Sequence, residues 1–233
     1  MADDQESTVL PDNWPTDQDL TFLSDLTYSA AVTEDMRTAL GRTTAESADF
    51  RKLPAELLKE PCPNVSITTI SDEQHPACGQ RGLFAARDLE PDAFVCLYIG
   101  HVHTNSLSDT DPHSDYDLNL DSTLGLSVDS AHSGNEGRFC NDYRGIAERP
   151  NAEFRDCLVQ VLSSKRAGGT KWERRVGLFV LSSGKAGKRK AGIKKGIEVL
   201  LSYGKGYWEG RQTLAKFRKD DEMLRIAEAA LNE

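Results

Sequence analysis

Two stretches of the sequence carry the residue types that could do chemistry, and the first runs from residue 128 to residue 154. Between apolar positions it places Asn135, Gly137, Arg138 and Asn141 close together. Amides and a guanidinium in such a setting suit a buried polar network better than a plain surface loop. We therefore take this stretch as the one around which the rest of the chain is organised.

The second stretch, residues 196–208, is an apolar strand that ends on Tyr203 and Gly204 and is followed by Trp208. A tyrosine gives a rigid apolar wall with one hydroxyl at its tip, so it can line a narrow channel and still orient a polar group. Tyr98 lies in another apolar stretch, residues 94–100. Taken alone, Tyr203 is better explained as a core residue at the end of a strand.

Two glycines flank a bend at residues 79–82. Because glycine has no Cβ, such a bend lets the backbone approach a ligand closely. On its own Gly-x-x-Gly is a weak signal, and a plain β-turn is the alternative.

Together these pieces resemble the SET domain of protein lysine methyltransferases. The hallmark stretches of that family read roughly Gly-Asn-x-x-Arg-Phe-x-Asn-His and Glu-Leu-x-x-x-Tyr-Gly. The matching residues here are Gly134, Asn135, Arg138, Phe139, Asn141, Glu198, Tyr203 and Gly204. The resemblance covers roughly residues 64–208 and departs at Asp142, where the family usually has histidine.

The resemblance implies transfer of a methyl group from S-adenosylmethionine to a lysine amine. This is a direct displacement, so the protein must align the two reactants and lower the pKa of the lysine by burial. Tyr203 matches the active-site tyrosine, whose hydroxyl orients the methyl group and the amine. Tyr98 matches a tyrosine that lines the lysine channel, and a purely structural role for it is equally open.

The resemblance also implies a site for S-adenosylmethionine. Asn141 matches the residue that contacts the cofactor and helps to close a knot-like crossing, in which the last strand passes under the loop of Asn141. Many family members close the site with a three-cysteine zinc cluster, but no cysteine follows Cys157, so Trp208 or a C-terminal helix must do so. The implied cofactor contacts are Arg81, Gly82, Leu83, Arg138, Phe139, Asn141, Asp142 and Trp208.

Length and composition fit one medium domain with extensions. The 233 residues are 38% apolar, which is enough for a sizeable core. No run of about 18 apolar residues occurs and the start is acidic, so we expect neither a spanning helix, a signal peptide nor membrane binding. The five cysteines show no metal or disulfide spacing, so we predict reduced thiols and no metal.

The fold class predicted by these patterns is α+β and predominantly β, with several small sheets around the crossing. Residues 1–15 are expected to be disordered, residues 16–63 to be a helical extension, and residues 209–233 to be a C-terminal helix. Within the SET region, 64–208, residues 101–127 form an insertion. Predicted helices cover 16–31, 33–40 and 54–59; predicted strands cover 65–70, 79–89, 94–100, 116–120, 126–129, 152–163 and 175–182; loops cover 101–115 and 183–195.

Charge is distributed unevenly around the net value of -9. The acidic insertion, residues 105–129, would flank a peptide groove in the family's layout and favour a basic, lysine-containing substrate such as a histone tail. A solvated loop is the alternative. The stretch Lys165–Lys195 holds eleven basic residues and only Glu173, which admits binding of nucleosomal DNA or RNA, or simply a charged loop.

The leading hypothesis is a S-adenosylmethionine-dependent protein lysine methyltransferase located in the nucleus, with the cytoplasm as the alternative location. The competing hypothesis is an inactive SET-like module that binds a basic peptide, or nucleic acid through Lys165–Lys195. A plain structural scaffold ranks third, because it would not require the motif residues to coincide.

Overall fold

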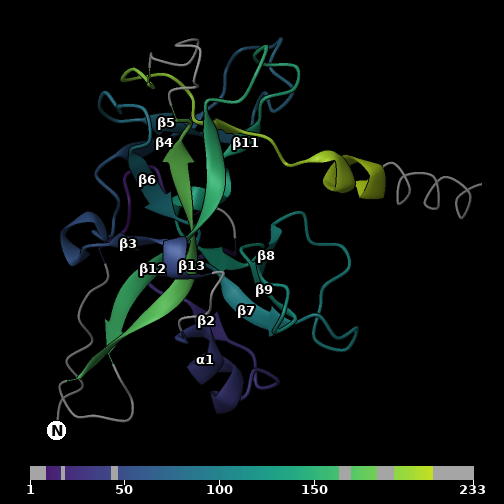
Figure 1. The fold of residues 1–233 in the computed structure, drawn as a ribbon. Helices are drawn as coiled ribbons and strands as arrows, with labels where there is room; N and C mark the ends of the chain where they lie inside the picture. Colours follow the sequence, from purple (N-terminus) through teal and green to yellow (C-terminus); the bar gives the residue numbers. More distant parts are fainter. Residues whose placement is uncertain (1–8, 17–18, 43–46, 163–168, 183–191, 212–233) are drawn as a thin grey trace, which may run out of the picture. The chain divides into compact units, whose positions relative to one another are not determined.

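The structure is a computed structural model that describes residues 9–16, 19–42, 47–162, 169–182 and 192–211 (Figure 1). The chain divides into two compact units, residues 1–201 and residues 202–233. No helix within the described ranges is long and apolar enough to span a membrane.

A long antiparallel hairpin forms the middle of a four-stranded sheet in the first unit (Figure 1). In the order of the sheet, the strands are β3 (Arg51–Leu53), β12 (Ala152–Leu162), β13 (Thr170–Val180) and β6 (Phe94–Leu97). Phe94 and Phe179 are buried and meet edge to face, with ring centroids 5.5 Å apart. The sheet thus contributes one side of the apolar core.

The predicted hairpin is confirmed, but its turn is shorter than the sequence indicated. We expected the turn to last until Arg174, whereas β13 begins at Thr170. Arg174 forms ion pairs with Asp121 and Asp156, at 2.9 and 3.0 Å. Because these charges are paired, the charged stretch of residues 171–175 is part of strand β13 and not of a turn.

A second four-stranded sheet follows the order β2 (Thr27–Tyr28), β7 (His101–Thr104), β9 (Leu126–Asp129) and β8 (Asp117–Asp121). The strands β8 and β9 confirm the prediction, but β7 lies where a loop was expected. Val102 and His103 are buried there, and the backbone of β7 is hydrogen-bonded on both edges.

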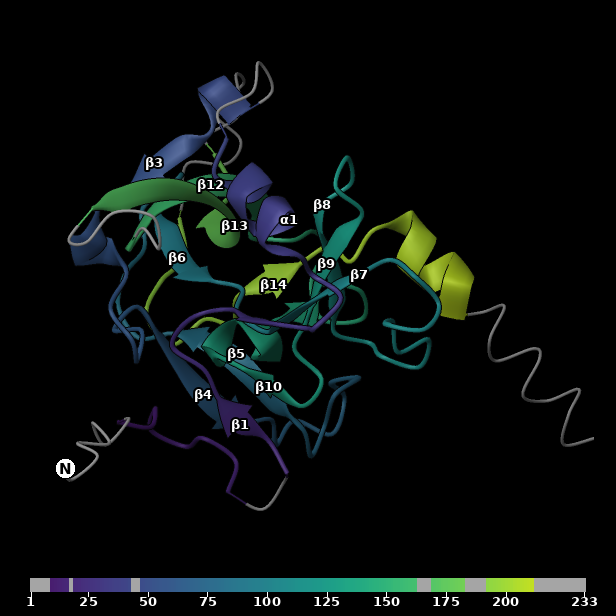
Figure 2. The ribbon, with the colours of Figure 1, turned by 90° about the horizontal axis from the view of Figure 1, so that it is seen from below.

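Three two-stranded sheets complete the first unit. They are β1–β10 (Thr21–Phe22 and Ser133–Gly134), β4–β5 (Val65–Thr69 and Arg81–Ala85) and β11–β14 (Asn141–Asp142 and Leu200–Leu201). In Figure 2 the pairs β1–β10 and β4–β5 lie on the opposite side of the unit from β3. The predicted class, predominantly β with several small sheets, is confirmed.

The helix predicted over residues 16–31 is wrong, because β1 and β2 occupy this segment. Its apolar stripe was Leu20, Leu23, Leu26 and Ala30, of which only Leu26 is buried. The backbone pairs with distant segments instead: Thr21 N–H donates to His132 O and Ser29 N–H donates to Val102 O, at 3.0 and 2.8 Å. Those long-range bonds replace the local bonds of a helix.

Of residues 1–15, which we expected to be disordered, the structure describes residues 9–15. Trp14 is buried and meets Phe22 and Phe139 edge to face, with ring centroids 5.1 and 5.6 Å apart. Residues 1–8 lie outside the described ranges.

The helix predicted at 33–40 is confirmed by α1 (Glu34–Leu40), whose first turn is capped by the Thr33 hydroxyl. The helix predicted at 54–59 is only the 3₁₀ turn η2 (Ala55–Leu57). Two more such turns are η1 (Ser47–Asp49) and η3 (Glu136–Phe139).

In the second unit, residues 205–211 are helical, so the C-terminal helix begins before the predicted residue 209. Residues 212–233, which that prediction mainly concerned, lie outside the described ranges. So does most of the loop predicted at 183–195, of which Ile193 is described and forms a bridge with Leu89.

Candidate cofactor site

The glycine bend and the segment before Leu200 lie side by side in the first unit. β5 pairs with β4 on one edge, and on the other edge Val199 N–H donates to Leu83 O at 2.7 Å. Phe84 and Glu198 form a bridge in the same ladder. The second stretch and the glycine bend therefore meet at β5.

The first predicted stretch joins them through β11 and β14. These strands are parallel, with Asn141 opposite Leu200 and Asp142 opposite Leu201. The pairing is extended by Tyr143 N–H, which donates to Leu201 O at 2.9 Å. The segments that sequence analysis singled out are thus neighbours, and whether one passes under the other stays a prediction.

The carboxylate of Glu198 lies where these three segments meet. Oε1 accepts a hydrogen bond from Asn141 Nδ2 at 2.8 Å, and Oε2 is 3.0 Å from His75 Nε2. The side chains of His75 and Glu198 are only 8% and 9% exposed. Such a buried carboxylate is fixed in place, because each of its oxygens has a donor.

Glu198 also explains why residue 82 is glycine. A Cβ on Gly82 would stand 2.7 Å from Glu198 Oε1 and 3.0 Å from the Phe84 ring. The sequence interpretation was that this glycine makes room for a ligand. In the structure the room beside it is filled by a carboxylate of the protein itself.

Arg138 and Phe139 make packing contacts around η3. The Arg138 guanidinium donates to the carbonyls of Ser130 and Ala131, at 2.8 and 3.3 Å, and lies 4.3 Å from the centroid of the Tyr116 ring. Phe139 packs on Trp14. These contacts give both residues a structural role, and their contact with a cofactor stays a prediction.

Asp142 and Arg81 complete the set of predicted cofactor residues in the first unit. Asp142 is buried, and its Oδ1 accepts a hydrogen bond from Arg144 N–H at 2.9 Å. The carboxylate is thereby committed in part to its own turn. Arg81 is half-buried and lies opposite Thr69 in the β4–β5 pair.

Tyr98 is almost fully enclosed. Its hydroxyl donates to Tyr116 O at 2.6 Å, and its ring packs on Phe154 with centroids 5.4 Å apart. Burial raises the pKa of this phenol, so it stays neutral and acts as a hydrogen-bond donor.

Tyr203 and Trp208 belong to the second unit, where they form an aromatic cluster with Tyr207. The rings of Tyr203 and Trp208 are stacked, with centroids 6.5 Å apart and an interplanar angle of 15°. Tyr207 meets both edge to face, at 4.9 and 5.3 Å. The cluster restrains Tyr203 within its own unit, and its catalytic role stays a prediction.

Sequence reasoning missed His75 and Asn151. Asn151 clamps the Glu198 strand, because its Nδ2 donates to Glu198 O at 2.7 Å and its Oδ1 accepts from Leu200 N–H at 2.8 Å. The polar turn that contains His75 gave no signal beyond its histidine. Asn151 falls within the first stretch, residues 128–154, but no sequence pattern pointed to its partners.

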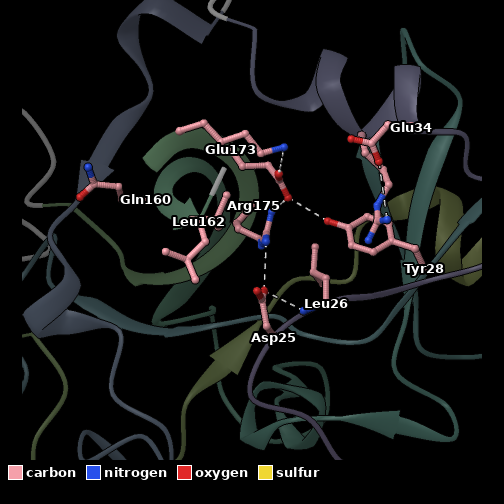
Figure 3. A pocket seen from close by; sticks show the side chains of 11 residues that line it. Asp25, Leu26, Tyr28, Glu34, Gln160, Leu162, Glu173 and Arg175 are labelled. Atoms are coloured by element: carbon pink, nitrogen blue, oxygen red, sulfur yellow. Dashed lines mark hydrogen bonds and ion pairs between the residues drawn. The ribbon is translucent and has the colours of Figure 1, made fainter. Parts of the chain in front are cut away.

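A pocket of about 490 Å³ lies elsewhere in the first unit, between α1, the Asp25–Tyr28 segment and the tip of the β12–β13 hairpin (Figure 3). Arg175 and Glu173 form its buried floor. Arg175 pairs with Glu173 at 2.5 Å and with Asp25 at 3.0 Å, while Tyr28 donates to Glu173 at 2.8 Å. None of the predicted site residues lines it.

The acidic insertion uses its carboxylates within the protein. Asp109 accepts from the Thr104 and Ser29 hydroxyls, both at 2.9 Å, and Asp117 pairs with His103 at 3.1 Å. These bonds hold part of the predicted loop to the second sheet. The insertion is therefore not a row of uncommitted aspartates.

The described part of the Lys165–Lys195 stretch is paired as well. Its ion pairs join Lys171 to Glu173, Arg174 to Asp121 and Asp156, Arg175 to Glu173 and Asp25, and Lys194 to Asp88. The remaining basic residues of the stretch lie outside the described ranges, except Lys195.

Comparisons with known proteins complete the description. No protein-family model matches the chain, and no curated protein matches it. Among solved structures, an active polycomb repressive complex 2 in the stimulated state is 24% identical, with a TM-score of 0.42 over 64% of this chain and 16% of the other.

The Chaetomium thermophilum complex gives a similar result. One of its structures is 25% identical over 60% of this chain, with a TM-score of 0.39. Another, in an autoinhibited conformation bound to S-adenosylmethionine, is 24% identical over 67% of this chain, with a TM-score of 0.43. The chain spans 15% to 17% of these solved chains, and at such TM-scores the likeness assigns no activity.

Proposed function

We propose that the chain is a S-adenosylmethionine-dependent protein lysine N-methyltransferase of the SET type. One observation carries the proposal. The Asn141 segment, the glycine bend and the strand that leads to Tyr203 resemble SET hallmarks, and they are hydrogen-bonded to one another around Glu198. If the resemblance of these segments were due to chance, the matching residues would not be expected to lie together in the fold.

The residues around Glu198 suit the cofactor. When bound, S-adenosylmethionine supplies an electrophilic methyl group on a sulfonium, together with an ammonium group. Asn141 Nδ2 is engaged by Glu198, so its Oδ1 is the atom that can accept a hydrogen bond from an ammonium. The other residues that would hold the cofactor are Arg81, Gly82, Leu83, Arg138, Phe139, Asp142 and Trp208.

The two tyrosines have different tasks. Tyr98 is a neutral wall of the lysine channel, because its hydroxyl is already committed to Tyr116 O. Tyr203 keeps the task of orienting the methyl group and the lysine amine through its hydroxyl. Enclosure by aromatic rings also lowers the pKa of the lysine, which must lose its proton before it can attack.

The substrate is a basic protein segment that contains a lysine, such as a histone tail, and the enzyme acts in the nucleus. The net charge of -9 favours encounter with such a segment. Nucleic acid is the less favoured partner, because several basic side chains of Lys165–Lys195 are paired with carboxylates of the protein itself, namely Lys171, Arg174, Arg175 and Lys194.

A second candidate is an inactive module that binds the same kind of peptide. The observation that favours it is Asp142, which stands where the resembled family has histidine and whose carboxylate is buried against the Arg144 turn. A negative charge there would weaken the hold on a cofactor carboxylate.

Two substitutions test the proposal. Tyr203→Phe should lower kcat by about 100-fold or more while the Kd for S-adenosylmethionine stays within about threefold, because only the methyl-orienting hydroxyl is lost. Asn141→Ala should raise that Kd by about 10- to 100-fold, the effect of one lost hydrogen bond to a charged group.

Calorimetric titration gives Kd, and transfer of a labelled methyl group to a lysine-rich peptide gives kcat. Tyr143→Phe, which removes a phenol hydroxyl but keeps the backbone hydrogen bond from Tyr143 N–H to Leu201 O, is the matched control. Transfer retained by both Tyr203→Phe and Asn141→Ala would refute the site. Cofactor binding without transfer in the natural sequence would favour the inactive module.

A further inference from the structure

We infer that His75 is a positioning residue for the cofactor, acting through Glu198 on the side chain of Asn141. The inference rests on the proposed function, because it concerns the same site. It goes beyond it, since His75 is not one of the motif residues that carry the resemblance.

The tautomer of His75 is fixed by its two neighbours. Ala77 N–H donates to Nδ1 at 3.0 Å, so Nδ1 is an acceptor and carries no proton. Nε2 must then carry the proton, and it donates to Glu198 Oε2 at 3.0 Å. A neutral imidazole is thus held in one orientation by its own loop and presents one N–H to a buried carboxylate.

Glu198 has little freedom to respond to a change. Its side chain is 9% exposed. Oε1 lies against Gly82, where an added Cβ would stand only 2.7 Å away, so the carboxylate has little room to move in that direction. Its backbone is tied on both sides, to the Phe84 ladder and to Asn151. His75 therefore fixes the orientation of the Glu198 carboxylate, and the carboxylate in turn fixes the orientation of the Asn141 side chain.

The Asn141 amide takes its orientation from this carboxylate. A carboxylate can only accept, so the group that faces it must be Nδ2, and Oδ1 points away from Glu198. Oδ1 then presents an acceptor to a donor group of the ligand. Without His75, Glu198 Oε2 would be buried with no donor, and rotation of the carboxylate toward another donor would release the amide.

The test compares three variants of the full chain. His75→Ala removes the donor, His75→Gln restores an N–H of similar reach, and Cys78→Ser is the matched control in the same loop, where Cys78 is exposed. One measurement is the position of the Asn141 side-chain amide signals in a ¹H–¹⁵N spectrum without ligand, assigned with Asn141→Asp. The other is the Kd for S-adenosylmethionine by calorimetry.

We expect His75→Ala to shift both Asn141 amide signals and to weaken S-adenosylmethionine binding by about tenfold. His75→Gln should restore most of the affinity, and Cys78→Ser should change neither measurement. Unchanged amide signals and an unchanged Kd in His75→Ala, while Asn141→Ala still loses affinity, would overturn the inference alone. Absence of binding by the natural sequence would overturn the proposed function, and the inference with it, even where the amide signals move.

Discussion

At the scale of single residues, two carboxyl groups stand out because they are buried together. Glu136, in η3, is 1% exposed, and its Oε1 accepts a hydrogen bond from Cys62 N–H at 2.8 Å. Glu60 lies against Glu136, and Asn135 Nδ2 donates to it at 3.4 Å. Burial, and then the charge of Glu136, raise the pKa of Glu60 to about 9. At neutral pH the pair therefore holds a proton.

This proton makes stability depend on pH in a definite direction. The folded-state pKa of Glu60 lies above its ordinary value of 4.5, so its contribution is complete below about pH 4.5 and is lost as the pH rises toward 9. The free energy of unfolding should fall over that range, with a slope of at most about 1.4 kcal/mol per pH unit.

Glu60→Gln, which imitates the protonated acid, should remove most of this slope between pH 5 and pH 9. Urea unfolding at a series of pH values measures it, and Glu56→Gln, at an exposed position in η2, is the control. An equal slope in Glu60→Gln and the natural sequence would show that the pair does not hold the proton.

At the scale of elements, the strand β13 is joined to the Asp25–Tyr28 segment by charge. Alternate residues Lys171, Glu173 and Arg175 share one face of β13, because side chains alternate along a strand. Glu173 accepts from Arg175 and Tyr28, as Figure 3 shows for the floor of the pocket. It also accepts from Lys171. The pKa of Glu173 is lowered, against the effect of burial, chiefly by Arg175.

Glu173→Gln should therefore lower the free energy of unfolding by about 3 kcal/mol, since among the described residues it leaves the buried Arg175 guanidinium with one carboxylate, that of Asp25. Glu148→Gln removes an ion pair with Arg149 whose carboxylate is 86% exposed, and should have almost no effect. Urea unfolding of both variants at pH 7 makes the comparison. A loss below about 1 kcal/mol in Glu173→Gln would mean that the network does not hold these elements together.

Some of the strands could be predicted from the sequence, and others could not. Strands such as β4, β9 and β12 were predicted because alternation is a local property that burial on one face imposes. The segment from Thr21 to Tyr28 was not, since its leucine spacing imitates a helix while its backbone pairs with residues more than 70 positions away. Local patterns cannot reveal such partners.

Of the residues in the candidate site, some could be predicted from the sequence and others could not. Gly82, Asn141 and Glu198 were singled out through the resemblance, and the structure brings them together. His75 was not, because its partner Glu198 is 123 residues away and a single histidine in a polar turn has no pattern. Tyr203 and Trp208 were singled out too, and their place in the site still depends on the proposed function.

At the scale of the whole molecule, the net charge of -9 determines how strongly the protein attracts a basic partner. Carboxylates of the acidic insertion form hydrogen bonds and ion pairs within the protein, as those of Asp109 and Asp117 do. Attraction must then come from the summed field of the chain, and not from one groove of aspartates. A summed field is screened by salt, but it is insensitive to any single charge.

The affinity for a lysine-rich peptide should therefore fall by about tenfold between 50 and 300 mM salt, because the Debye length shrinks to well below the size of the molecule. Asp111→Asn, at an exposed position in the insertion, should change the affinity by less than about twofold. Fluorescence anisotropy of a labelled peptide measures both. A peptide of equal length with glutamine in place of its flanking lysines serves as the control, and its affinity should be nearly independent of salt. If Asp111→Asn alone reproduced most of the loss seen at high salt, the attraction would come from a local acidic groove, and the insertion would regain the role that its sequence first indicated.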